Sequence, residues 1–152
     1  MPQIPVTTRI ATDRPLVKID NLAVPDPAAG QGFSITVPVG YRYQIASMFM
    51  RLITDANVAD RIPTLQISTP SGIIFRWTSP FLVVASETRY ITFASGLAQV
   101  NWSVLQLTGQ VALPPTITLE EGSVISISIA GIQATDQISL INAQILSQFV
   151  AE

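Results

Sequence analysis

The chain has 152 residues and a formal net charge of −2, and charged side chains occupy only 12% of its positions. It contains no cysteine and no histidine, which excludes disulfides, thiolate or imidazole metal sites and every nucleophile that needs a histidine base. A single lysine and the slight negative charge argue against nucleic-acid partners, and the absence of any run of about 18 apolar residues argues against a membrane partner.

The length predicts one domain, with enough buried surface for a hydrophobic core that is stable without disulfides or structural metal ions. The shortage of charge predicts that part of the surface is covered, because a lone soluble domain uses charged side chains to stay dispersed. The composition therefore favours an oligomer or an assembly subunit. A monomer with a neutral polar surface of hydroxyl and amide side chains is the alternative.

Residues 1–30 are expected to form an extended arm. Five prolines fix φ and remove backbone donors in this segment, so no helix or central strand runs through most of it. Its aliphatic residues follow no helical period, and a disordered tail would contain fewer of them. We expect an edge strand near residues 16–24 and an arm that lies along its own domain or a neighbouring subunit. The aliphatic candidates for this contact are Ile10, Leu16, Val17, Ile19, Leu22 and Val24.

The longest predicted strand, residues 41–54, carries apolar side chains on both faces. A strand with one solvent face alternates apolar and polar residues instead. We therefore expect this strand to be covered on both sides, with one face in contact with another subunit. The isolated arginines are expected to form ion pairs between subunits. The candidate interface residues from these two arguments are Met48, Met50, Leu52, Arg51 and Arg61.

A period of two in apolar residues, typical of β-strands, continues from residue 33 onward. The turn at Pro70-Ser71-Gly72 predicts a hairpin, and similar turn signals recur at intervals of roughly 8–12 residues. No segment of ten or more residues combines a helical period with caps. The clearest of about eight expected strands are residues 33–37, 41–54, 64–69, 73–78, 88–93, 123–130 and 138–146, with shorter runs at 81–85, 102–107 and 116–119.

About eight strands with these turn intervals predict an all-β, antiparallel sandwich. A jelly roll is the two-sheet arrangement for eight strands, and we expect this fold over residues 31–152.

The sequence offers little for catalysis or for metal and cofactor binding. Asp55 and Asp60 carry oxygens that suit calcium, but their loop lacks the glycine and the bidentate glutamate of calcium-binding loops. Turn formation is the simpler interpretation. Gly30 and Gly32 precede a strand rather than the helix that a phosphate loop requires. We therefore expect no catalytic, metal-binding or cofactor-binding residues, and a protein that is not an enzyme.

Several turn-and-strand segments resemble those of small structural proteins of tailed bacteriophages. The run VPVGYRYQI at residues 37–45 resembles their V-P-x-G-x-x-aromatic-x-aliphatic entry into a long strand. The run ADRIPTLQI at residues 59–67 resembles G-N-R-x-P-x-L-x-aliphatic, with Ala59 and Asp60 in place of glycine and asparagine.

A third segment resembles the lead into a late strand of the same proteins. It consists of LPP at residues 113–115 and LEEGSVI at residues 119–125. Asp136-Gln137 before the last expected strand also fits, and the resemblance covers roughly residues 33–147.

This resemblance implies a β-sandwich of the phage virion. Its first implication is a capsid decoration (cement) protein on the outer surface of the head. Such a protein would bind the major capsid protein and stabilise contacts between capsomers as a homo-oligomer, which we expect to be a trimer because symmetric sites favour symmetric binders. The alternative is a tail or fibre module that recognises a host-surface glycan. A glycan-binding module outside viruses and an enzyme are less favoured.

Overall fold

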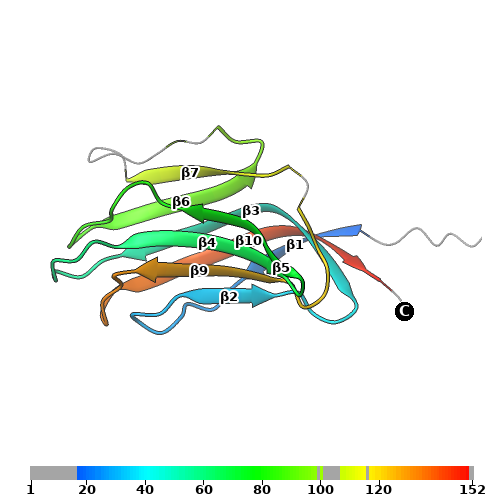
Figure 1. The fold of residues 1–152 in the computed structure, drawn as a ribbon, viewed down its shortest axis with the longest axis horizontal. Helices are drawn as coiled ribbons and strands as arrows, with labels where there is room; N and C mark the ends of the chain where they lie inside the picture. The colour runs from blue at the N-terminus through cyan, green and yellow to red at the C-terminus, as the bar shows by residue number, and fades with distance from the viewer. Residues whose placement is uncertain (1–16, 99, 101–106, 116, 151–152) are drawn as a thin grey trace, which may run out of the picture.

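The computed structural model describes residues 17–98, 100, 107–115 and 117–150, and all regular elements in them are strands. The strands form two packed sheets (Figure 1). The six-stranded sheet has the order β1 (Val17–Ala23), β10 (Gln137–Phe149), β3 (Tyr41–Ile53), β6 (Thr88–Ser95) and β7 (Thr108–Leu113), with β8 (Thr118–Leu119) paired to β3. The four-stranded sheet has the order β2 (Phe33–Thr36), β9 (Val124–Ala130), β4 (Ile62–Thr69) and β5 (Gly72–Thr78).

The expected all-β class with two packed sheets is confirmed, but details of the strand assignment differ. The described residues form ten strands rather than about eight. β7 was not expected, and it pairs with β6 in parallel. The apolar run at residues 81–85 contributes only an isolated bridge between Val83 and Arg61, because the chain there crosses from one sheet to the other. Most of the strand expected at residues 102–107 lies outside the described residues.

The expected edge strand near residues 16–24 is confirmed as β1, which is fully paired with β10. Leu22 and Val24 pack against the core. Residues 17–24 therefore belong to the sandwich. The sandwich begins earlier in the chain than the expected boundary between arm and sandwich at residue 30. Ile10 and Leu16 lie outside the described residues.

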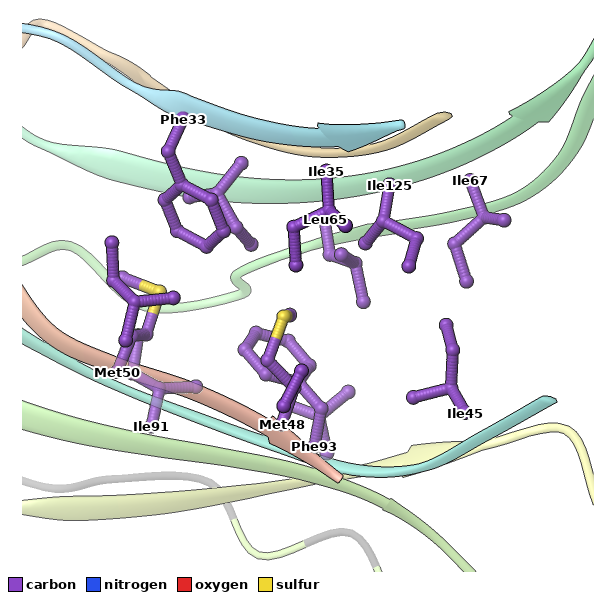
Figure 2. Close-up of a cluster of buried hydrophobic side chains, with 14 of the residues drawn as sticks. Phe33, Ile35, Ile45, Met48, Met50, Leu65, Ile67, Ile91, Phe93 and Ile125 are labelled. Atoms are coloured by element: carbon purple, nitrogen blue, oxygen red, sulfur yellow. The ribbon is translucent and has the colours of Figure 1, made fainter. Parts of the chain in front are cut away.

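The core lies between the sheets, where the inward residues of both meet (Figure 2). Met48, Met50 and Leu52 point into it and are at most 2% exposed. Their expected place at a subunit interface is therefore wrong. The alternation in β3 sends these side chains inward, because the four-stranded sheet supplies the apolar cover that the sequence led us to expect from another subunit.

Candidate interaction surfaces

One buried ion cluster joins the loops at one end of the sandwich. The Arg61 side chain is fully buried, and it donates from Nε to Asp136 Oδ2 at 2.9 Å and from Nη2 to Asp136 Oδ1 at 3.0 Å. Its Nη2 also donates to Asp55 Oδ1 at 2.6 Å, and Nη1 donates to the carbonyl oxygens of Asn57 at 2.8 Å and Ala59 at 2.9 Å. All five N–H donors of a guanidinium are used in this way.

Both oxygens of the Asp136 carboxylate also accept two hydrogen bonds each. It accepts the backbone N–H of Asp55 at 2.8 Å and that of Gln133 at 2.7 Å in addition to the two bonds from Arg61. Burial opposes ionisation of this carboxyl group, but the hydrogen bonds from Arg61, Gln133 and Asp55 outweigh it and hold the pKa of Asp136 below its usual value. Asp136 is therefore ionised at neutral pH.

Asp55 connects the cluster to the surface, with a side chain 13% exposed. The Thr135 hydroxyl and the backbone and side-chain amides of Asn57 donate to it. The hydrogen bond from Thr135, with those from Asn57 and the charge of Arg61, outweighs burial and holds the pKa of Asp55 below its usual value. Asp55 therefore has the turn-forming contacts expected from the sequence and, in addition, an ion pair with Arg61.

This cluster corrects the expectation for Arg61. An arginine whose donors are all used inside its own subunit has none left for a neighbouring subunit or a ligand. The residues that the sequence analysis missed are its partner Asp136 and the link through Asp55. Arg61 and Asp136 had each been noted in the sequence, in the segment at residues 59–67 and before the last expected strand, but nothing in the sequence pairs them, and the structure shows that they bind each other.

The second feature is the exposed face of the six-stranded sheet, which we call the outer face. It consists of the alternate residues of β1, β10, β3, β6 and β7 that point away from the four-stranded sheet. Its charged side chains are Arg42, which pairs with Glu120 at 3.0 Å, and Arg51, which donates to the Ser139 hydroxyl at 2.9 Å. The other side chains are amides, hydroxyls and apolar groups.

Three of the expected interface residues lie on the outer face. Val17 and Ile19 on β1 are 57% and 64% exposed, and Arg51 on β3 is half-buried. Arg51 forms no ion pair with the described residues, so its charge is available to a partner. Val17, Ile19 and Arg51 accordingly keep their expected place as interface candidates.

A hollow of about 440 Å³ lies at the centre of the outer face. Phe49 stands in it, stacked on Tyr90 with ring centroids 6.2 Å apart. No side chain that lines the hollow carries a charge. Its lining, which we call the hollow residues, includes Asn21, Ser47, Phe49, Thr92, Asn142 and Gln144.

The third feature is a set of exposed apolar residues in β5 and in the chain that follows it. They are Ile73 and Ile74 at the start of β5, where Ile73 pairs with Ser68, and Phe81, Leu82 and Val84 beyond its end, where Val83 bridges to Arg61. In the described residues β5 pairs only with β4. The single charged residue from 72 to 84 is Arg76, which donates to Gln66 Oε1 at 2.8 Å.

Other chemical features are few in the part of the chain that the structure describes. No group of three or more acidic side chains is placed to hold a metal ion, and no helix is long and apolar enough to cross a membrane. Comparison of the chain with models of protein families, with curated proteins and with solved structures gives no match.

Proposed function

We propose that this protein is a non-enzymatic structural component of a phage virion. Its function in this proposal is capsid decoration: it binds the major capsid protein on the outer surface of the head as a homotrimer and stabilises contacts between capsomers. The phage-like segments at residues 37–45, 59–67 and 119–125 support this class of protein.

We further propose a jelly roll as the topology. A jelly roll forms when a long hairpin of eight strands is wrapped into two sheets, so that the first strand pairs with the last and each following pair is nested inside. Without β7 and β8, the strand pairs β1–β10, β2–β9, β3–β6 and β4–β5 have this nested order. β7 and β8 then form an insertion before the seventh strand of the roll.

The observation that carries the functional proposal is the outer face. A face several strands wide with two charged side chains, Arg42 and Arg51, is unusual for a surface in contact with water alone. Protein–protein interfaces are depleted of charge in this way and enriched in aromatic residues and arginine. A subunit held between neighbours in a shell has such a surface.

The test is a cryo-electron microscopy reconstruction of particles made with and without this chain. Decoration predicts hundreds of copies on the head surface, and heads without the protein should break at lower temperature. A dozen or fewer copies, confined to the tail, would show that the decoration function is wrong.

The hollow favours a second candidate, a tail or fibre module that binds a neutral glycan. The carboxamides of Asn21, Asn142 and Gln144 both donate and accept hydrogen bonds, as vicinal sugar hydroxyls do. Phe49 supplies an aromatic face beside them. Screening the full chain on a glycan array tests this function: saturable binding that is lost in Gln144→Ala supports it, and no bound glycan contradicts it.

A further inference from the structure

We propose that the outer face binds a saccharide that carries a carboxylate. One neutral ring of the saccharide lies in the hollow, and the carboxylate of the next ring binds the guanidinium of Arg51. This inference goes beyond capsid decoration: it rests on the second candidate function, the glycan-binding module, and names the chemical class of its ligand. Four features of the described residues support it: an available cation, an aromatic pair beside it, a strained bulge next to it and the amide lining of the hollow.

Arg51 supplies a cation whose donors are only partly used. Its Nε donates to the Ser139 hydroxyl at 2.9 Å, and among the described residues no acceptor contacts its two Nη groups. Ser139 is 3% exposed, so the hydroxyl that holds Nε belongs to a buried side chain. The two Nη groups of a guanidinium form a planar fork that matches the two oxygens of a carboxylate. The free side of Arg51 therefore suits a planar anion.

An aromatic pair lies beside this cation on the outer face. Arg51 pairs with Tyr90 in the register of β3 and β6, and Phe49 lies two residues before Arg51 on β3. All three side chains therefore point to the same side of the sheet. Phe49 and Tyr90 stack with ring centroids 6.2 Å apart and an interplanar angle of 19°. Since Phe49 also lines the hollow, the cation is separated from the hollow by two residues of one strand, roughly 7 Å.

A β-bulge in β10 joins the Arg51 contact to the hollow. Residues three apart in a regular strand point to opposite faces, yet the Ser139 hydroxyl contacts Arg51 and Asn142 lines the hollow. The register of β10 against β3 shifts between Ser139 and Asn142, and Leu140 within the shift has a φ of +53°. A leucine in the left-handed region is strained, and both bulges and backbone strain concentrate at functional sites. The bulge places Ser139 and Asn142 on the same face.

The lining of the hollow suits a saccharide better than an apolar protein segment. Its polar side chains are those of Asn21, Ser47, Thr92, Asn142 and Gln144. An apolar partner would leave these amides and hydroxyls without hydrogen bonds, which is unfavourable for each of them. Sugar hydroxyls both donate and accept hydrogen bonds, as carboxamides do, and the carbon side of a sugar ring packs on an aromatic face such as that of Phe49. A saccharide of neutral rings alone would leave the Nη groups of Arg51 unused, so the charge favours an acidic sugar.

Binding of the full chain to an array of acidic oligosaccharides tests the inference, with each glycan paired to a carboxyl-reduced counterpart in which the carboxylate has become an alcohol. The wild type should bind an acidic glycan at least about tenfold more tightly than its reduced counterpart, as expected for hydrogen bonds between charged groups. Arg51→Met should bind both forms equally, and Arg51→Lys, which keeps the charge without the fork, should keep part of the preference. Arg42→Met is the matched control and should keep all of it, because it removes a cation of the same face that Glu120 already pairs.

Three results would each overturn the inference: no acidic glycan bound, equal binding of acidic and reduced forms by the wild type, or a preference that survives in Arg51→Met. An equal loss of preference in Arg42→Met would overturn it too, because it would show attraction by overall charge. A preference for sulfated or phosphorylated glycans would reject the carboxylate. Arg51 is half-buried and makes one side-chain hydrogen bond, so its variants are expected to keep the unfolding midpoint of the wild type.

Separate measurements distinguish this inference from the proposed functions. Binding of neutral glycans that is lost in Gln144→Ala, without any preference for acidic ones, would leave the glycan function standing and reject the role of Arg51. Attachment to heads with the hollow buried against the capsid protein in the reconstruction would leave decoration standing and overturn the inference. Binding of acidic glycans through Arg51 by a protein that does not attach to heads would support the inference and reject decoration.

Discussion

The guanidinium of Arg61 binds the carboxylate of Asp136 through two parallel hydrogen bonds of 2.9 and 3.0 Å, and both side chains are fully buried. The bonds close a contact between segments 75 residues apart in the chain. Since the buried donors and acceptors of this pair are satisfied by its neighbours, removal of either partner leaves an isolated charge in the interior. The pair is therefore expected to hold the loops of this end together.

Substitution of Arg61 by methionine should destabilise the protein strongly. It leaves Asp136 buried without its cation, and loss of one partner of a buried pair costs about 3–5 kcal/mol. The free energy of unfolding in urea measures the effect. Arg76→Met is the matched control, since Arg76 is exposed and its side chain makes one hydrogen bond, and it should change stability by about 0.5 kcal/mol or less. Equal effects of the two substitutions would contradict the role of the cluster.

The pH dependence of stability should follow from Asp136. Its pKa is lower in the folded chain than the ordinary value of 3.8, so the ionised form stabilises the fold fully above pH 3.8. This contribution is lost as the pH falls from there through the lower folded pKa. Urea midpoints should therefore be level from pH 7 to about pH 5 and fall below pH 3.8. The gap between wild type and Asp136→Asn should narrow over the same acid range, and a constant gap would refute this explanation.

Met50→Ala should report on the core and not on assembly. The Met50 side chain is fully buried, and truncation of a buried methionine to alanine costs about 2–5 kcal/mol. The melting temperature should fall in the isolated protein, while the subunit count at temperatures below the transition should be unchanged. Val58→Ala, at a position 96% exposed, is the control and should melt like the wild type. A change in subunit count without a change in melting temperature would restore the interface assignment.

Gly131 should tolerate alanine much less well than Gly96. Both glycines have positive φ, +73° and +76°, so a side chain costs about 1–2 kcal/mol at either position. A Cβ at Gly131 would also clash with the carbonyl oxygen of Asp60, whereas nothing lies within 4 Å of one at Gly96. Thermal unfolding of the two alanine variants should therefore differ by several degrees. Equal melting temperatures would show that the loop at Asp60 moves aside.

Deletion of residues 1–16 should leave the sandwich folded and weaken its attachment to the head or to a neighbouring subunit. A longer deletion is unsuitable, because β1 is paired with β10 and Leu22 packs against the core. The expected result is a melting temperature close to that of the full chain and reduced binding to undecorated heads. A large fall in melting temperature with unchanged binding would place the segment on its own domain.

The all-β class, the turns and most strand positions follow from the amino-acid sequence alone. These depend on local physics: the period of two in β3 and β9, the proline and glycine turns, and the prolines at positions 15 and 25 that bound the strand at residues 17–23. The absence of cysteine and histidine likewise restricts the possible chemistry without any knowledge of the fold.

Which partners these elements contact depends on the three-dimensional fold. A period of two shows that Met50 and Arg51 face opposite sides, but not which side is covered, and the four-stranded sheet settles this in favour of Met50. Arg61 resembles any isolated surface arginine in the sequence, because its partner Asp136 lies 75 residues away. The hollow likewise forms where β1, β10, β3 and β6 are brought together by pairing over long distances along the chain, which local patterns do not encode.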